Sequence, residues 1–263
     1  MSSLDEAAAR VVRQHARTSS LMGVEFVPVY RVVRADSVDE TTTPTADAVA
    51  GGASTEAPPV ASDSVRALKA RRLEAIRERY LAEMPHAPFI STYTNIVFGE
   101  GDPAARLMFV GEAPGFEEDR TGRPFVGRAG QLLDKMIVAM GLKRSDVYIA
   151  NVLKVRPPDN ATPTIEEAEA SAPFLYDQIE AIAPEALVTL GLPATRTLLK
   201  TSDSMGRLRG HWATFTHPGT GFTCPVMPTF HPAFLLRQYT DENRAKVWSD
   251  LKQVMVKLGL GAR

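Results

Sequence analysis

The chain of 263 residues predicts an α/β fold, in which a central, mainly parallel sheet of four strands is covered by helices on both faces. Short apolar runs of strand length alternate with stretches of roughly 10 to 18 residues that have helical spacing. Gly- and Pro-rich turns follow the runs, as they do at the carboxyl edge of a parallel sheet. With 44% hydrophobic residues, the chain is long enough for one domain and accessory segments.

The N-terminal quarter is predicted to stand apart from this domain. Residues 1–34 combine an amphipathic helix with a short apolar motif. Residues 35–63 are rich in Thr, Ala, Ser, Pro, Gly and Asp and contain no aromatic residue, which predicts a disordered linker. The catalytic domain is expected over residues 64–263, and it begins with a charged helix at 64–82.

Strands and helices are then expected to alternate along the domain. The expected strands are residues 107–110, 147–152, 186–190 and 225–229, and the expected helices are 127–140, 164–182, 193–200 and 241–258. Either Thr162 or Thr164 is expected to cap the helix at 164–182. Residues 205–217 are expected to form an irregular basic stretch.

Bulk properties exclude several classes of protein. No apolar run approaches the roughly 20 residues of a membrane span, and the N-terminus lacks the basic and apolar regions of a secretory signal. The single cysteine, Cys224, cannot form an internal disulfide, so a cytoplasmic protein is expected. Residues 1–63 hold 5 basic and 9 acidic residues (−4), and the rest hold 25 and 22 (+3), which permits a local DNA-binding surface.

Two motifs after the first expected strand suit a ligand pocket. They are Gly-Glu-Ala-Pro-Gly at 111–115 and Gly-Arg-Pro-Phe-Val-Gly at 122–127. The glycines allow a close approach of ligand or backbone, Glu112 supplies a carboxylate, and Phe125 supplies an aromatic face. The combination suits a flat, polar ligand such as a nucleobase, although Gly and Pro also build purely structural turns.

Two further polar residues are expected at the same sheet edge. Asn151 ends the second strand, and its amide can donate to and accept from the edge of a base. His231 follows the fourth strand and can donate to an oxygen that gains negative charge. Either residue can instead serve a structural purpose, Asn151 by tying down a turn and His231 by capping a helix.

Three long stretches resemble the uracil-DNA glycosylase superfamily, most closely its family 4 enzymes. They are residues 95–134, 151–158 and 229–237, and the resemblance extends over roughly residues 64–260. It implies a three-layer α/β/α sandwich that flips deoxyuridine out of single- or double-stranded DNA and cleaves its N-glycosidic bond, which initiates base-excision repair. We also expect a monomer in the bacterial cytoplasm, associated with the nucleoid.

The resemblance assigns roles to individual residues of the base pocket. It implies that Phe125 stacks on uracil and that Asn151 binds its N3–H and O4 edge. It implies that His231 stabilises O2 as uracilate leaves, while Glu112 and Glu118 position water or stabilise the sugar cation.

The resemblance also implies contacts to the base and to DNA outside these roles. Ala113 and Gly115 are expected in the base pocket; Gly115 leaves open a position that other families fill to exclude thymine, so the exclusion must come from elsewhere. The residues expected to contact DNA are Gly127, Arg128, Arg209, Leu235 and Arg237. Leu235 and Arg237 lie where the family's loop wedges into the duplex, and Arg209 belongs to a basic run that is either a DNA contact or a solvated surface.

The chain departs from family 4 at its metal site. Those enzymes normally hold a four-iron, four-sulfur cluster on four cysteines, and the corresponding residues here are Met84, Ala87, Val155 and Ser171. None of these replaces a thiolate, so we predict no cluster and no other cofactor, with a small hydrophobic plug in its place. A related branch cross-links to DNA through a His in a basic loop; residues 156–163 contain no His, which predicts ordinary turnover.

Other functions remain open at this point. The chain is either a uracil-DNA glycosylase, a glycosylase for another deaminated base such as hypoxanthine or xanthine, or a catalytically silent DNA-binding or scaffolding module. Residues 1–34 either bind a protein partner or pack back on the catalytic domain.

Overall fold

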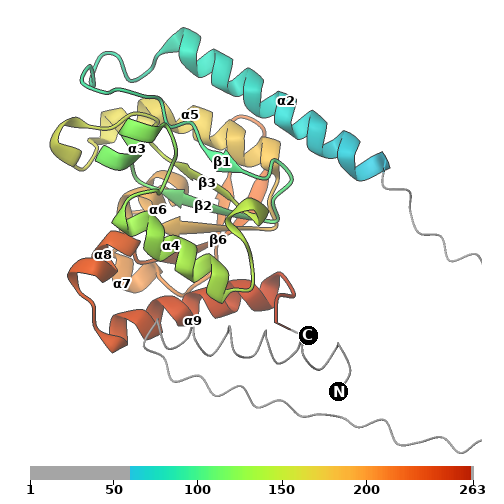
Figure 1. The fold of residues 1–263 in the computed structure, drawn as a ribbon, viewed down its shortest axis with the longest axis vertical. Helices are drawn as coiled ribbons and strands as arrows, with labels where there is room; N and C mark the ends of the chain where they lie inside the picture. The colour runs from blue at the N-terminus through green and yellow to red at the C-terminus, as the bar shows by residue number, and fades with distance from the viewer. Residues whose placement is uncertain (1–59, 262–263) are drawn as a thin grey trace, which may run out of the picture.

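A six-stranded mixed sheet forms the centre of the protein (Figure 1). The structure is a computed structural model and describes residues 60–261. The expected N-terminal helix, the apolar motif and the linker up to residue 59 lie outside the described residues. The strands are β1 (Glu100–Gly101), β2 (Leu107–Gly111), β3 (Tyr148–Asn151), β4 (Ala186–Leu190), β5 (Ala213–Thr216) and β6 (Thr223–Thr229).

The strand order is β1-β3-β2-β4-β6-β5. The four inner strands are parallel and are the four that the sequence predicts. The edge strands β1 and β5 pair antiparallel with their neighbours, so the expected count of four was too low by two. Strand β5 lies in the stretch expected to be irregular, because only Phe215 of its four residues is buried and the apolar signal is weak.

Helices cover both faces of the sheet, which confirms the three-layer sandwich. They are α2 (Val60–Glu83), α3 (Phe116–Thr121), α4 (Arg128–Ala139), α5 (Ile165–Ile182), α6 (Leu192–Leu199), α7 (Met205–Leu208), α8 (Pro232–Arg237) and α9 (Asp241–Lys257). Figure 1 shows α4 and α9 on one side of the sheet and α2 and α5 on the other. Helix α2 starts four residues before the expected position 64 and so includes the end of the expected linker.

The core consists of two layers that the strands supply alternately. Met108 and Val110 of β2 pack on the side of α2, α5 and α6, whereas Leu107 and Phe109 pack on the side of α4 and α9. Alternation with both faces buried explains why the inner strands appear in the sequence as continuous apolar runs. Among the described residues, no helix combines the length and the apolar character needed to cross a membrane.

The helix at α5 begins with a capping box. Thr164 Oγ1 accepts the N–H of Glu167 at 3.2 Å, and the Glu167 carboxylate accepts the N–H of Thr164 at 2.7 Å. Of the two threonines expected to cap this helix, Thr164 is therefore the cap. Thr162 remains in the preceding loop and faces a cavity at the carboxyl edge of the sheet.

Candidate active site

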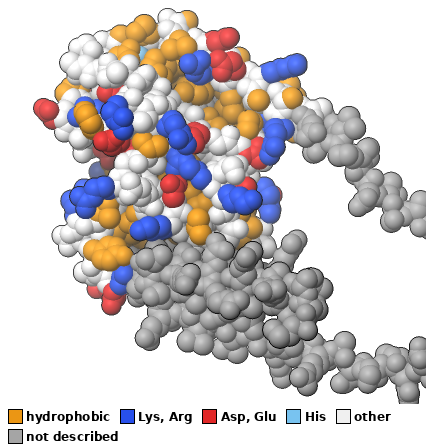
Figure 2. Space-filling view, in the orientation of Figure 1, with side chains coloured by type: hydrophobic (Ala, Val, Ile, Leu, Met, Phe, Trp, Pro, Cys, Tyr) orange, Lys and Arg blue, Asp and Glu red, His pale blue; other side chains and the backbone are white. Residues whose placement is uncertain are grey.

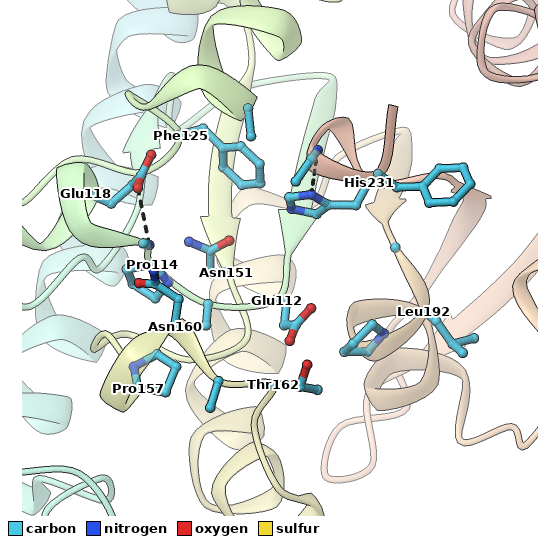
Figure 3. Close-up of a pocket in the computed structure, with 18 of the residues that line it drawn as sticks. Glu112, Pro114, Glu118, Phe125, Asn151, Pro157, Asn160, Thr162, Leu192 and His231 are labelled. Atoms are coloured by element: carbon cyan, nitrogen blue, oxygen red, sulfur yellow. Dashed lines mark hydrogen bonds between the residues drawn. The ribbon is translucent and has the colours of Figure 1, made fainter. Parts of the chain in front are cut away.

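A cavity of about 640 Å³ opens at the carboxyl edge of the four parallel strands (Figure 3). The strand pairing brings Gly111 of β2 beside Asn151 of β3, and the end of β6 beside the end of β4. Eight residues expected in the site line this cavity: Glu112, Ala113, Gly115, Glu118, Phe125, Asn151, His231 and Arg237. Four expected DNA contacts do not line it: Gly127, Arg128, Arg209 and Leu235.

Gly111 lets two side chains of the site approach each other. A Cβ on Gly111 would lie 2.4 Å from Oδ1 of Asn151 and 2.5 Å from Cζ of Phe125. Those distances are shorter than any van der Waals contact, so a larger residue would displace one of the two side chains. The first glycine of the motif is therefore required by the packing of the pocket itself.

Phe125 is held in an unusual backbone conformation. Its φ of 51° lies in the left-handed region, which costs energy for a bulky residue. Its main-chain carbonyl accepts a hydrogen bond from Arg144 Nη1 at 3.1 Å. A Cβ on Gly130 of α4 would lie 1.9 Å from the same carbonyl oxygen, so the helix packs directly against this backbone. The surroundings thus hold the ring at the cavity, 5.6 Å from the ring of His231 between centroids.

Asn151 ends β3 with its side chain buried at the cavity. It is 1% exposed, and its Oδ1 has no hydrogen-bond partner among the described residues. Buried amide oxygens are nearly always paired, because an unpaired one loses its bonds to water without compensation. An acceptor in this state is suited to the N–H of a ligand.

His231 is the N-cap of α8, and that role sets its protonation. Its Nδ1 accepts the N–H of Ala233 at 3.0 Å, so the ring hydrogen of the neutral form lies on Nε2. Burial of the ring, and secondarily the positive charge of Arg237, lower the pKa of His231 to about 4. At neutral pH the residue is therefore an uncharged donor through Nε2–H.

Glu112 is half-buried, and its carboxyl group points toward Thr162 at the cavity (Figure 3). Burial raises the pKa of its carboxyl group, while a hydrogen bond from Thr162 and the charge of Arg237 act in the opposite direction. The group is a carboxylate in a partly dehydrated setting, beside a cation at the cavity rim. Such a carboxylate can orient a water molecule or stabilise a positive sugar.

Glu118 is arranged differently from the catalytic group expected from the sequence. Its Oε1 accepts the N–H groups of Val126 and Gly127, each at 2.8 Å, and its Oε2 accepts the N–H of Gly115 at 3.2 Å. Both oxygens are thus used to join the two halves of the motif. We correct its role to that of a positioning residue.

Asp119, the neighbour of Glu118, is also structural. It is 5% exposed, and its Oδ1 accepts the N–H of Thr94 at 2.7 Å and that of Asn95 at 3.0 Å. It therefore anchors the segment before β1 to helix α3.

Two expected DNA contacts are contradicted by their surroundings. Leu235 is 1% exposed and belongs to the core beneath α8, because it shares with Pro232 the face of the helix that turns inward. It does not project as a wedge. Arg209 forms an ion pair with Asp250 and donates to the carbonyl oxygen of Lys246 at 2.6 Å, which ties it to α9.

The other DNA expectations remain compatible with the structure. Arg237 is exposed at the end of α8 and reaches the cavity rim. Gly127 is the N-cap of α4, and Arg128 is exposed at the first position of that helix. Phe234, which precedes Leu235, is partly exposed and lines the cavity, so it is an apolar side chain of α8 available at the opening.

One wall of the cavity was missed by the sequence analysis. The loop between β3 and α5 contributes Pro157, Asn160 and Thr162. Its shape depends on two successive left-handed residues, Asp159 and Asn160, with φ of 51° and 53°. Asp and Asn tolerate this conformation better than most residues. The sequence Pro157-Pro158-Asp159-Asn160 was therefore the available signal for a shaped loop at this position.

The region that corresponds to the family's iron–sulfur site does not fit such a cluster. Its four corresponding residues, Met84, Ala87, Val155 and Ser171, offer no thiolate, and Cys224 is buried in β6 with a raised pKa. Among the described residues, no group of three or more His, Cys, Asp and Glu side chains is arranged to hold a metal ion.

An aromatic plug occupies this region instead. Tyr80 is 0% exposed, its Oη is 2.8 Å from Nδ1 of His86, and its ring meets that of Phe174 edge-on at 5.0 Å. The ring of His86 packs edge-on against Tyr93 at 4.8 Å. The expected small hydrophobic plug is therefore corrected to an aromatic one with a polar centre. We call Tyr80, His86, Tyr93 and Phe174 the aromatic plug.

Comparisons with known proteins agree with this geometry. The family model described as "Uracil DNA glycosylase superfamily" matches residues 98–252. The chain is 43% identical over 182 residues to a type-4 uracil-DNA glycosylase of Thermotoga maritima, across 69% of this chain and 92% of that protein. It is 42% identical over 167 residues to the type-4 enzyme of Archaeoglobus fulgidus, across 62% of this chain and 82% of that protein. A type-5 uracil-DNA glycosylase of Pyrobaculum aerophilum is 40% identical over 115 residues, which cover 38% of this chain and 50% of that protein. The chain belongs to the uracil-DNA glycosylase superfamily, and within it to the type-4 group.

Proposed function

We propose that this protein is a uracil-DNA glycosylase, which hydrolyses the N-glycosidic bond of deoxyuridine flipped out of DNA and so initiates base-excision repair. The observation that carries the proposal is the pairing, in one cavity, of a neutral donor with an unpaired buried acceptor. The donor is Nε2–H of His231, and the acceptor is Oδ1 of Asn151. A uracil ring requires this pair, because it presents an oxygen at O2 beside an N–H at N3.

Base recognition follows from the placement of three side chains. The ring of Phe125 offers a face for stacking at the cavity. Asn151 accepts the N3–H of uracil, and its amide N–H donates to O4, which distinguishes uracil from cytosine at the same edge. His231 then lies on the O2 side of the base (Figure 3).

The chemical step moves the bonding electrons onto the base. When the bond between C1′ and N1 breaks, both electrons stay with uracil, and negative charge gathers on O2. His231 donates a hydrogen bond to this oxygen and keeps its proton, since burial holds the imidazole neutral. Glu112 orients a water molecule, whose oxygen forms the new bond to C1′. One proton of this water ends on the uracil anion, so the products are a free base and an abasic sugar.

Exclusion of thymine is proposed to come from the loop wall rather than from Gly115. With O2 at His231 and N3 at Asn151, C5 of the base points away from His231. Figure 3 shows Pro114 and Asn160 on that side of Asn151. A methyl group at C5 would meet this wall, which is held by the bond from Arg156 Nε to Oδ1 of Asn160 at 2.7 Å.

The enzyme acts on DNA, and its oligomeric state, its location and a protein partner are further parts of the proposal. We propose a monomer in the cytoplasm, associated with the nucleoid, and a protein partner for residues 1–34. The mild positive balance of residues 64–263 suits local contacts to phosphate. Figure 2 shows Lys and Arg side chains interspersed with Asp and Glu on the face in view, so this face carries local basic groups rather than a broad basic field.

The proposal is tested on end-labelled oligonucleotides that carry one modified base. Uracil is placed in a single strand and opposite G or A, and thymine, hypoxanthine and xanthine are placed at the same position. We expect alkali-labile scission at uracil and none at thymine, with a loss of about 10²- to 10³-fold in Asn151→Ala and His231→Gln. Scission only at hypoxanthine or xanthine would reassign the substrate. Binding of uracil-containing DNA without scission would instead identify a silent module.

A further inference from the structure

A fully buried lysine lies beneath the cavity and has no part in the steps above. Lys154 is 0% exposed and follows Asn151 by three residues in the turn after β3. Its Nζ donates to the main-chain carbonyl oxygen of Asn151 at 2.7 Å and to Oε1 of Gln178 at 2.5 Å. A lysine is almost never buried completely, so its presence here calls for a specific use.

The turn that Lys154 closes is a junction of the site. The N–H of Leu153 donates to the carbonyl oxygen of Glu112 at 3.1 Å. The carbonyl oxygen of Lys154 accepts the N–H of Val97 at 2.7 Å. The side chain of Lys154 returns to the first residue of the turn and so holds Asn151 and the Glu112 loop in one unit.

The bonds of Lys154 persist whether or not it is protonated. Burial lowers the pKa of its amino group to about 7, so ammonium and neutral amine coexist near neutral pH. Both forms have at least two hydrogens, enough for the two carbonyl-type acceptors. The ring of Phe98, with its centroid 5.6 Å from Nζ, covers another side of the group.

We propose that Lys154 is a positioning residue for uracil recognition, which fixes the main chain of Asn151 so that its side-chain amide faces the base. The inference rests on the proposed function. Without the amino group, the carbonyl oxygen of Asn151 would be buried without its donor, and the turn would relax to find another. The loss would reach catalysis through Asn151, since that residue carries the contact to the base.

A double-mutant cycle tests this route. Lys154→Met, which keeps the apolar length of the side chain, is placed in the wild-type protein and in Asn151→Ala, and single-turnover excision of uracil is measured in all four proteins. We expect a roughly ten- to hundredfold loss in the wild-type background and less than about a twofold further loss in Asn151→Ala. Equal losses in the two backgrounds, or no loss in the wild type, would overturn the proposal.

Gln178→Met is the matched control. It removes the other acceptor of Lys154 in the same buried network but leaves the bond to Asn151. We expect its thermal midpoint to fall about as much as that of Lys154→Met, with less than roughly a threefold change in excision. If excision falls equally in both variants, the effect of Lys154 is on stability alone and the proposal fails.

Two further outcomes are separated by design. If Lys154→Met does not fold, Lys154→Gln, which keeps N–H donors on a shorter side chain, enters the same cycle with the same criteria. A wild-type protein that excises no uracil would contradict the proposed function. A wild type that excises uracil and is insensitive to the Lys154 substitution contradicts only this inference.

Discussion

At the scale of single residues, the chemistry of the site depends on which groups are neutral and which are charged. His231 is neutral because its Nδ1 is used as a helix cap and its ring is buried. Glu112 is nearby, but burial moves the pKa of its acid upward. The two shifts act in opposite directions, so the pH dependence of the reaction distinguishes the two groups.

The first prediction concerns this pH dependence. As pH falls, Glu112, whose pKa lies above its ordinary 4.5, takes up a proton before His231, whose pKa is about 4. The single-turnover rate of excision should therefore fall with an apparent pKa above 4.5, and His231→Gln should leave this acid limb in place. Glu112→Gln should lower the rate and remove this acid limb. An ionisation near 6.5 that disappears in His231→Gln would contradict the assignment.

The second prediction concerns the space between Asn151 and Phe125. Gly111→Ala adds a methyl group that overlaps both side chains, so uracil excision should fall by at least about 100-fold while the protein remains folded. Gly206→Ala is the control, because its added Cβ would have Ser204 Oγ at 3.9 Å as its nearest neighbour. Rates and circular dichroism of both variants check this. Near-normal excision by Gly111→Ala would show that Asn151 and Phe125 do not pack as tightly against Gly111 as described.

At the scale of elements, short segments that shape the cavity are held by side chains bonded to main-chain groups. Glu118 at the start of α3 joins the loops on either side of it. The aromatic plug joins α2, α5 and residues between them, and contributes no side chain to the cavity. Predictions for the two differ accordingly.

Removal of the Glu118 carboxylate should reduce both stability and activity. Glu118→Ala leaves three N–H groups without their acceptor, which should lower the free energy of unfolding by about 2 kcal/mol and slow excision because Phe125 and Gly115 lose their relative placement. Urea unfolding and single-turnover rates measure the two effects. Glu117→Ala, which removes a 45% exposed carboxylate paired with Arg120, should stay within about 0.5 kcal/mol of wild type. Equal behaviour of the two variants would contradict the positioning role.

Removal of the plug should reduce stability with little effect on chemistry. Tyr80→Ala opens a cavity between α2 and α5 and should lower the free energy of unfolding by about 3 to 5 kcal/mol. Tyr80→Phe, which removes the hydroxyl group and with it the hydrogen bonds to His86 and Ser171, should cost about 1 to 2 kcal/mol. Excision measured below the lowered melting temperature should change by less than roughly threefold in both. A large loss of excision in Tyr80→Phe would mean that the plug also shapes the pocket.

The same scale explains what the sequence could predict. The four inner strands were predictable because both of their faces are buried, so each is a continuous apolar run. The edge strands β1 and β5 and the six-residue helices α3 and α8 were missed, since they are too short or too exposed for a periodic signal. Leu235 was misplaced for a related reason: the helix at 232–237 had not been recognised, so its inward face was unknown.

Within the site, residue types were predictable and contacts were not. The positions of Glu112, Asn151 and His231 after strands placed them at one edge of the sheet. Nothing in the sequence indicated that Glu118 binds main-chain N–H groups. Those hydrogen bonds depend on how close residues 111–115 and 122–127 lie in space. The cavity wall formed by the loop between β3 and α5 depends on the left-handed backbone at Asn160, which sequence periodicity does not report.

At the scale of the whole molecule, the proposed catalytic groups and the region that corresponds to the cluster site lie in different parts of the fold. The reacting side chains come from the carboxyl edge of the sheet, and the region corresponding to the cluster is filled by the aromatic plug. We therefore propose that this chain excises uracil with its own side chains and without an iron–sulfur cluster.

The most direct test is single-turnover excision of uracil by the full-length protein before and after chelator treatment, with iron measured by mass spectrometry in the same samples. We expect excision at the same rate in both samples and iron far below one atom per chain. Excision that is lost on chelation and returns when iron and sulfide are supplied would show instead that the enzyme depends on a cluster.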